Sequence, residues 1–171
     1  MPKIILKINS ASDPFYDSDN ICCYLVDASL SPDMLEKCRK TDKMVLICGV
    51  DATSKCKQHD LDGIVIEPDV KKPLKIQIKK ELAEVGQRKV LGVVVPAHRH
   101  EAMLAGETEP DFIIFKFTPQ EAVSAFEVIR WYNELFLIQS AIDLTLGLQN
   151  ITDIDVDFVI INSCDYKDFG C

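Results

Sequence analysis

Short apolar segments recur along the chain, separated by polar stretches. Eight can be marked: Lys3 to Asn9, Ile21 to Ala28, Met44 to Val50, Gly63 to Glu67, Val90 to Val95, Phe112 to Phe117, Phe136 to Ile142 and Phe158 to Asn162. Most are continuously apolar rather than alternating, which is typical of strands buried on both faces of a parallel sheet. Each is too short to span a bilayer, so the pattern predicts eight buried strands and no membrane helix.

The polar stretches between these segments contain signals for helix starts. Ser31-Pro32-Asp33 places a serine N-cap before a proline, and Thr118-Pro119-Gln120-Glu121 combines the same arrangement with a capping glutamate. A strand, a helix and a strand follow one another between residues 91 and 117. Eight strands with helices between them predict an α/β fold, a small TIM-type (β/α)8 barrel in a single domain over residues 1–171.

Two connections lack the sequence pattern of a helix that a regular barrel requires: the one after the first strand and the one after the last. Residues 10–20 are rich in Ser, Asp, Pro and Asn, and only nine residues follow Asn162. We therefore expect an incomplete or distorted barrel that lacks a helix after the first strand and after the last. Strand faces left bare by a missing helix would favour a partner that covers them, so a homo-oligomer is predicted.

Composition excludes several kinds of partner. The chain has 171 residues and a formal net charge of −8 with a pI near 4.9, so neither nucleic acid nor an anionic membrane surface is expected to bind it. The seven cysteines are odd in number and contain no Cys-x-x-Cys pair, which favours reduced thiols and a cytoplasmic location. No signal-peptide pattern precedes the first strand.

A more specific pattern lies between the fifth and sixth apolar segments. It combines Gly92, Arg99, His100, Ala102, Met103, Ala105, Gly106, Glu107, Asp111 and Phe115. This string resembles the fifth-strand, fifth-helix and sixth-strand pattern of the thiamine phosphate synthase family, which includes the TenI proteins. The resemblance implies a small barrel that joins a pyrimidine diphosphate to a thiazole phosphate with Mg²⁺, at the carboxyl ends of its strands.

The resemblance also implies which positions would bind the ligand, and most of them are altered. The second strand should carry cations for the diphosphate, but Asp27 stands in that region. The glycine pair of the seventh strand corresponds to Ser140-Ala141, and the Ser-Gly pair of the eighth corresponds to Asn162-Ser163. By this resemblance the ligand-binding residues are Asp27, Ser140, Ala141, Asn162 and Ser163.

Candidates for metal binding and catalysis are few. Of the metal-binding pair implied by the resemblance, Asp51 aligns and Asp69 lies one residue before the second position, so Mg²⁺ would bind to Asp51 and Asp69. No catalytic residue is assigned apart from Lys116, at the end of a predicted strand. A lysine there is a candidate Schiff-base or anion-binding group.

Because the phosphate-binding positions are altered, the resemblance predicts a family member without synthase activity. It would be a small-molecule-binding or regulatory protein linked to thiamine metabolism. The first alternative is an enzyme, a related transferase with altered chemistry at the open end of the barrel; it would use Asp27, Asp51, Asp69, Lys116 and Ser140. The second alternative is a protein-interaction scaffold whose incomplete barrel docks onto a partner.

Overall fold

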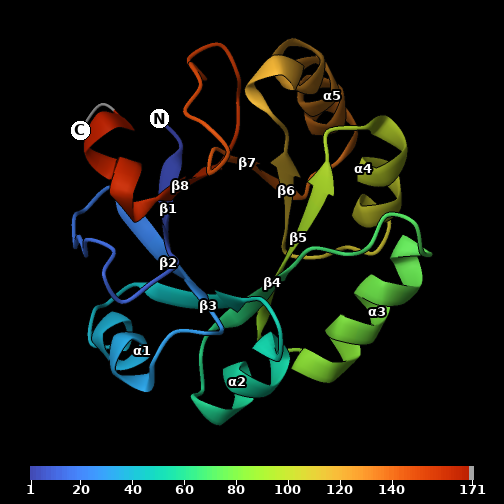
Figure 1. The fold of residues 1–171 in the computed structure, drawn as a ribbon. Helices are drawn as coiled ribbons and strands as arrows, with labels where there is room; N and C mark the ends of the chain where they lie inside the picture. Colours follow the sequence, from blue (N-terminus) through green and yellow to red (C-terminus); the bar gives the residue numbers. More distant parts are fainter. Residues whose placement is uncertain (170–171) are drawn as a thin grey trace.

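The structure, a computed structural model, describes residues 1–169. Eight parallel strands follow one another in chain order around a closed barrel, and β8 pairs with β1 (Figure 1). The strands are β1 (Lys3–Ile8), β2 (Ile21–Asp27), β3 (Met44–Cys48), β4 (Gly63–Ile66), β5 (Val90–Pro96), β6 (Phe112–Lys116), β7 (Gln139–Asp143) and β8 (Phe158–Asn162). The predicted TIM-type fold is confirmed, and the sheet itself is complete.

Helices cover the outside of the barrel between β2 and β7. They are α1 (Pro32–Arg39), α2 (Ala52–Gln58), α3 (Leu74–Val85), α4 (Arg99–Gly106) and α5 (Ala122–Leu135), with the 3-10 helices η1 (Pro119–Glu121) and η2 (Ser163–Phe169). Both predicted helix starts are confirmed. Ser31 is the N-cap of α1, and Thr118 and Glu121 form a capping box in which the Thr118 amide donates to Glu121 Oε2 at 2.8 Å.

The helical layer is incomplete, as Figure 1 shows. Residues 9–20 connect β1 to β2 as a loop, which confirms the first predicted gap. After β8, the described residues form the seven-residue η2 and no α-helix. A further gap was not predicted: residues 144–157, between β7 and β8, also form a loop.

Loop side chains take the place of the missing helix at β1 and β2. Phe15 stacks on Tyr24 of β2 with ring centroids 5.2 Å apart, and the Tyr24 hydroxyl donates to the Tyr16 carbonyl at 2.8 Å. Tyr16 in turn packs on Tyr166 of η2 at 4.7 Å. Tyr24 is fully buried as a result. The strand face is therefore not bare, and the reason for predicting a homo-oligomer does not hold there.

The seventh strand begins three residues later than predicted, because its expected first residue packs elsewhere. Phe136 ends α5, where its ring stacks on Tyr132 at 4.7 Å. A methyl group on Gly106 of α4 would lie 2.7 Å from the Phe136 ring, so this aromatic side chain fills the space between two helices. The strand then starts at Gln139.

Apolar side chains from all eight strands fill the inside of the barrel. This interior cluster comprises Ile5, Cys23, Leu25, Leu46, Val65, Val94, Phe112, Ile114, Ala141 and Ile160. Toward the amino ends of the strands, Phe112 and Phe158 close the interior in an edge-to-face contact at 5.9 Å. The barrel is thus a packed core, and polar side chains are left to the opposite, open end.

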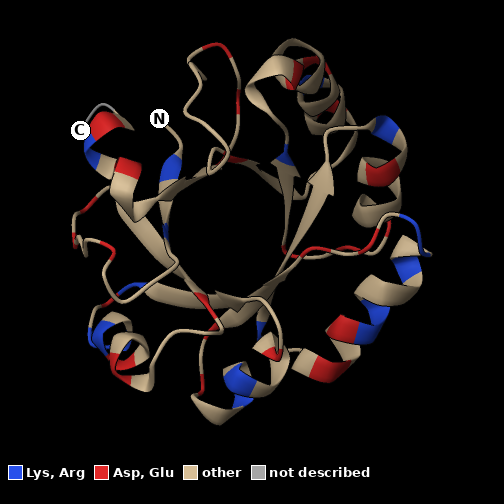
Figure 2. Ribbon diagram, viewed as in Figure 1, with Lys and Arg blue, Asp and Glu red and all other residues tan. Residues whose placement is uncertain are grey.

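The outer surface carries both signs of charge. Figure 2 shows basic and acidic residues interspersed on the outer helices rather than gathered on one side. In residues 1–169 no helix combines the length and apolarity required to cross a membrane. The six described cysteines are free thiols. The cytoplasmic location stays a prediction.

Candidate functional site

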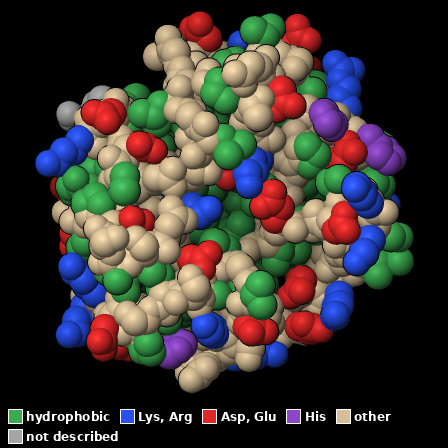
Figure 3. Space-filling view, viewed as in Figure 1, with side chains coloured by type: hydrophobic (Ala, Val, Ile, Leu, Met, Phe, Trp, Pro, Cys, Tyr) green, Lys and Arg blue, Asp and Glu red, His purple; other side chains and the backbone are tan. Residues whose placement is uncertain are grey.

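The open end of the barrel, called the mouth here, lies at the carboxyl ends of the strands. Side chains alternate along a strand, so the last inward side chain of each strand reaches the mouth. A cavity of about 480 Å³ lies among these strand ends. Its polar lining residues are Lys7, Asp27, Cys48, Glu67, Lys116 and Asp143. In Figure 3 basic and acidic side chains border the hollow at the centre of the face.

The strand register fixes the order of these side chains around the rim. Asp27 of β2 is the register partner of Cys48 of β3, and Lys116 of β6 is the partner of Asp143 of β7. Lys7 of β1 is level with Asn162 of β8. Parallel pairing therefore brings residues more than a hundred positions apart in sequence to one cavity.

Two mouth carboxylates are held in the same way. Asp27 Oδ1 accepts hydrogen bonds from the Ser29 amide at 2.9 Å and the Ser29 hydroxyl at 2.6 Å. Asp143 Oδ1 accepts from the amide and hydroxyl of Thr145 at the same two distances. Both side chains are fixed by a residue two positions later, which orients them toward the cavity without closing off the second oxygen.

Asp27 is ionised over a wide pH range. Partial burial raises the pKa of its carboxyl, but the hydrogen bonds from Ser29 and the positive charges of Lys7 and Lys55 outweigh it. The pKa therefore lies below its usual value of 3.8. At neutral pH Asp27 is a fixed negative charge and a hydrogen-bond acceptor.

The two mouth lysines differ in their partners. Lys116 Nζ lies 3.3 Å from both carboxylate oxygens of Glu67, and its side chain is 30% exposed. Lys7 is half-buried and forms no side-chain hydrogen bond or ion pair with the described residues. Lys116 is therefore paired directly, whereas Lys7 has no direct partner among the described residues and acts on Asp27 and Cys48 through its charge.

The mouth thiol is not an activated nucleophile. Burial raises the pKa of Cys48; Lys7 lowers it, and the negative charges of Asp27, Asp143 and Glu67 raise it further. A raised pKa keeps Cys48 as the neutral thiol at neutral pH, whereas nucleophilic cysteines need the thiolate. The carboxylates and lysines are therefore the groups available for chemistry.

Seven residues were predicted for ligand binding or metal binding, and of these only Asp27 lines the mouth cavity. The candidate catalytic residue Lys116 lines it too. Asn162 lies beside the cavity: its amide donates to the Thr145 carbonyl at 3.1 Å and to Asp165 at 3.3 Å, and its oxygen accepts from Asn9 at 3.0 Å. Asn162 thus ties together the ends of β1, β7 and β8. Its role is to hold the rim.

The other predicted ligand-binding residues lie away from the mouth. Ser140 is buried near the start of β7, where its amide donates to Asp157 Oδ2 at 3.0 Å. Ala141 belongs to the barrel interior, and Ser163 is fully buried at the start of η2. The Ser163 hydroxyl has no hydrogen-bond partner in residues 1–169. None of the three borders the mouth cavity, so the structure does not bring them to a ligand there.

The two residues predicted to bind Mg²⁺ are not brought together. Asp51 has a left-handed backbone (φ 62°) at the start of α2 and borders a hollow with Glu81 and Glu84 of α3. Asp69 borders a different, smaller hollow beside Glu67. Within residues 1–169 no three His, Cys, Asp or Glu residues form a group that could hold a metal ion.

Four polar residues of the mouth were not predicted as site residues: Lys7, Cys48, Glu67 and Asp143. A usable signal existed in the two-residue period of the strands. Counting from Ile5 places Lys7 on the inner face of β1, and counting from Ala141 places Asp143 on the inner face of β7. A charged residue at the inner carboxyl end of an otherwise apolar strand predicts a site residue.

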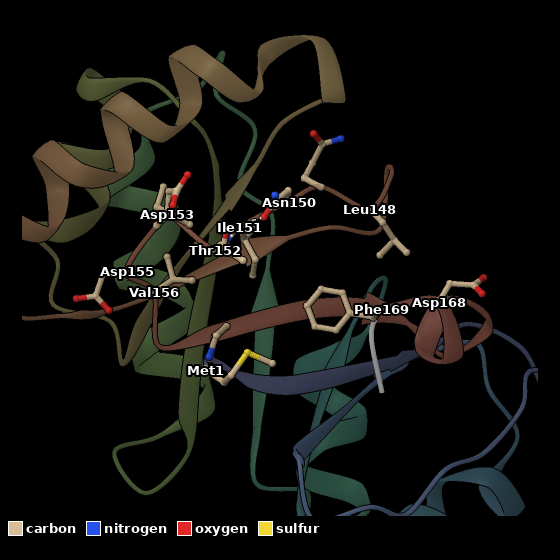
Figure 4. A pocket seen from close by; sticks show the side chains of 13 residues that line it. Met1, Leu148, Asn150, Ile151, Thr152, Asp153, Asp155, Val156, Asp168 and Phe169 are labelled. Carbon is tan, nitrogen blue, oxygen red and sulfur yellow. Dashed lines mark hydrogen bonds between the residues drawn. The ribbon is translucent and has the colours of Figure 1, made fainter.

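A larger hollow of about 790 Å³ lies outside the barrel, along the β7–β8 loop. Figure 4 shows Leu148 of this loop and Phe169 of η2 on opposite sides of it, with Met1 nearby. The charged side chains that line it are aspartates, and within residues 1–169 no lysine or arginine lines it. The mouth, smaller but lined by both charges from several strands, is the better site for chemistry.

The residues behind the family resemblance pack the barrel. A methyl group on Gly92 would lie 2.5 Å from the Phe112 ring, and Asp111 Oδ2 accepts from the Leu91 amide at 2.7 Å. The Arg99 guanidinium lies 5.2 Å from the centre of the Trp131 ring. These roles are structural, so the pattern indicates a barrel and not a reaction.

Comparison with known proteins gives the fold and no family. No family model matches the chain, and no curated protein matches it. Among solved structures, the tryptophan synthase alpha subunit of Pyrococcus furiosus matches with a TM-score of 0.64 and 10% identity, over 95% of this chain and 88% of that one. Tryptophan synthase of Mycobacterium tuberculosis matches with a TM-score of 0.55 and 12% identity, over 95% and 83%.

These matches overturn the sequence-based family. The resemblance to thiamine phosphate synthase and TenI, and the link to thiamine metabolism drawn from it, are wrong. No family model or curated protein supports them, and the solved structures compared above are tryptophan synthases. At 10–12% identity the likeness to those subunits shows the barrel fold alone.

Proposed function

We propose that the protein is an enzyme that acts on a small polar metabolite at the mouth of the barrel, by acid–base chemistry. The observation that carries this proposal is the convergence of two lysines and three carboxylates on one cavity. Barrel enzymes place their catalytic groups at this end, on the ends of several strands. A cavity of about 480 Å³ lies within the usual size of small-molecule sites.

Four of the five charged groups have a role in this proposal. Asp27 and Asp143, fixed by Ser29 and Thr145, would accept protons or hydrogen bonds from the substrate with their second oxygens. Lys116, held by Glu67, would donate to an oxygen that becomes negative during the reaction. Ile160 and Val94 form the apolar floor of the cavity and would exclude water beneath the substrate.

Untargeted mass spectrometry tests this proposal without knowledge of the substrate. The purified protein is incubated with a bacterial metabolite extract, beside the double variant Asp27→Asn/Asp143→Asn. Asp153→Asn, an exposed aspartate of the β7–β8 loop, is the matched control. We expect at least one metabolite to be consumed by the wild type and the control but not by the double variant. Equal profiles for all three proteins would contradict the proposal.

Tryptophan synthesis is the first specific pathway to test, because tryptophan synthase alpha subunits are among the similar solved structures. The shared fold over 95–98% of the chain supports it. The test is growth without tryptophan of a bacterial strain that lacks its own alpha subunit. Growth with the wild type and not with Asp143→Asn would support this role. A lack of growth with the wild type would exclude a role in tryptophan synthesis. The broader proposal of an enzyme at the mouth would then be decided by the extract experiment.

Self-association is a second proposal, and its place is the hollow along the β7–β8 loop. Leu148 lines this hollow and is 36% exposed, and Leu146 nearby is 51% exposed. Sedimentation velocity of the wild type and of Leu148→Glu tests it. A dimer that dissociates in the variant would support an interface between copies. A monomeric wild type at high protein concentration would contradict it.

A further inference from the structure

The charged groups at the mouth differ in how completely the protein satisfies them. Glu67 neutralises Lys116. In residues 1–169 Lys7 has no hydrogen bond or ion pair through its side chain, although it is half-buried in β1. A half-buried ammonium has lost part of its hydration, so an anion placed beside it is favoured more than in open solvent. Lys7 therefore marks the position for a negatively charged group of the ligand.

The mouth carboxylates, in contrast to Lys7, need a hydrogen-bond donor from the ligand. Asp27 and Asp143 use their Oδ1 atoms for internal hydrogen bonds, and their Oδ2 atoms accept none from the described residues. Asp143 is only 6% exposed, so little water can serve its free oxygen. A buried carboxylate oxygen without a donor is costly. A ligand donor, best a cationic one, would satisfy it.

The total charge of the mouth narrows the choice of ligand. Two lysines face three carboxylates, so the ring has one excess negative charge. A ligand with several negative charges and no cation, such as a diphosphate, would be repelled by Asp27, Glu67 and Asp143. A ligand with one anionic group and one cationic group would match both the unpaired lysine and the free carboxylate oxygens.

We propose that the mouth binds a zwitterionic ligand, whose carboxylate or phosphate pairs with Lys7 and whose protonated amine binds the free oxygens of Asp27 and Asp143. This inference rests on the proposed function and names its substrate class: small amino acids and amino-phosphates. Lys116 is the register partner of Asp143 and is already neutralised by Glu67, so this pair is not needed for the charge recognition of the ligand.

Two matched sets of probes test the inference by NMR titration of the amide signals at constant ionic strength. The first set is β-alanine, propionate and propylamine, and the second is 2-aminoethyl phosphate, ethyl phosphate and ethylamine. We expect the zwitterion of at least one set to shift the amides of Ile8, Ala28 and Leu144, with an affinity about tenfold above those of its single-charge analogues. The set that binds more tightly distinguishes a carboxylate from a phosphate ligand.

Variants separate the two halves of the recognition. Lys7→Gln should reduce the affinity for the zwitterion about tenfold, whereas Lys79→Gln, which removes the same charge from an exposed position on α3, should leave it unchanged. Asp143→Asn should lower the affinity for the zwitterion to that of the analogue that carries only the anionic group. Circular dichroism of each variant confirms that the barrel is folded.

Two results would overturn the inference. If propionate or ethyl phosphate shifts the mouth amides as tightly as its amino counterpart, the site binds plain anions, and the proposed function stands without the zwitterion. If no probe shifts the mouth amides, the zwitterion class is excluded. The metabolite-extract experiment then decides the proposed function, since it does not depend on these probes.

Discussion

Gly63 and Gly92 occupy positions where the barrel has no space for a side chain. A methyl group on Gly63 would lie 2.1 Å from the Val90 carbonyl oxygen, and one on Gly92 would lie 2.5 Å from the Phe112 ring. Neither residue needs a positive φ, so the requirement is room between neighbouring strands rather than backbone freedom. The two glycines set how closely β4, β5 and β6 pack.

Gly92→Ala should destabilise the protein by about 1–3 kcal/mol, because the added methyl overpacks the barrel interior. Urea denaturation measures the change. Phe112→Leu makes room for the methyl, so the double variant should lose less than the sum of the two single losses. Strict additivity would show that the clash with the Phe112 ring is not the cause.

Asp27 gives the stability of the protein a defined pH dependence. Its pKa is lower in the folded state than its usual value of 3.8, so its ionised form stabilises the fold above that pH. The contribution is lost as the pH falls through the lowered pKa. Asp27→Asn should therefore lower the urea midpoint at pH 7, and the difference from the wild type should shrink toward pH 3. A difference that is constant with pH, or equal to that of Asp153→Asn, would contradict this assignment.

At the scale of elements, a repeated hydrogen bond joins strands in pairs at the amino end of the barrel. An aspartate directly before β4, β6 and β8 accepts from an amide at the beginning of the preceding strand. The pairs are Asp62 with Val45 at 2.7 Å, Asp111 with Leu91 at 2.7 Å and Asp157 with Ser140 at 3.0 Å. These strand-base aspartates fix the register of each pair at its amino end.

Asp111→Ala should cost about 1–3 kcal/mol, because it leaves the Leu91 amide without its acceptor at a partly buried position. Asp153→Ala removes an exposed carboxylate that forms no side-chain hydrogen bond or ion pair within residues 1–169, and it should cost less than about 0.5 kcal/mol. Thermal denaturation of both variants checks the difference. Equal midpoints would show that the strand-base hydrogen bond adds nothing to stability.

Elements could be predicted where their signals are local. The starts at Ser31 and Thr118 were predicted because an N-cap and a proline act on the next turn of the chain. The absence of a helix between β7 and β8 was not predicted, because the loop still buries Ile154 and Val156 and its apolar content is similar to that of a helix. Phe136 was assigned to a strand because its packing partners Tyr132 and Gly106 are known only from the fold.

At the scale of the whole molecule, the barrel is closed although its helical layer is not. The loop before β2 covers the barrel with Phe15 and Tyr16, and Lys37 of α1 lies over the Phe15 ring at 4.6 Å. Aromatic side chains bury a large area for few residues, so a short loop can take the place of a helix. The loop is therefore part of the core and not a flexible connection.

Phe15→Ala should destabilise the whole barrel by about 1–3 kcal/mol, below the range for a fully buried phenylalanine since Phe15 is half-buried. If the chain is one domain, as predicted, far-UV circular dichroism and the fluorescence of the single tryptophan, Trp131, should report the same transition in urea. The midpoint should fall while the slope stays constant. Two separate transitions in the wild type would contradict a single domain.

The family prediction failed for a reason that applies to the whole fold. The pattern from Gly92 to Phe115 contains residues that any tight strand–helix–strand unit needs: glycines at close approaches and an aspartate that joins two strands. Such a pattern specifies packing, which unrelated barrels share. The reaction depends on the mouth, where Lys7, Asp27 and Asp143 come from distant parts of the sequence.

The sequence by itself determined the strands, most of the helices and the barrel class, because these depend on the period of apolar residues and on signals within one turn of the chain. It also placed Asp27 and Lys116 at strand ends. Only the tertiary structure decided which charged residues share a cavity, since Lys7 and Asp143 meet through barrel closure and not through sequence neighbourhood. Motif position had placed Ser140, Asp51 and Asp69 at the site. The direction of Ser140 depends on strand register, and the places of Asp51 and Asp69 depend on how their loops lie against α2 and α3, so only the folded chain decides them.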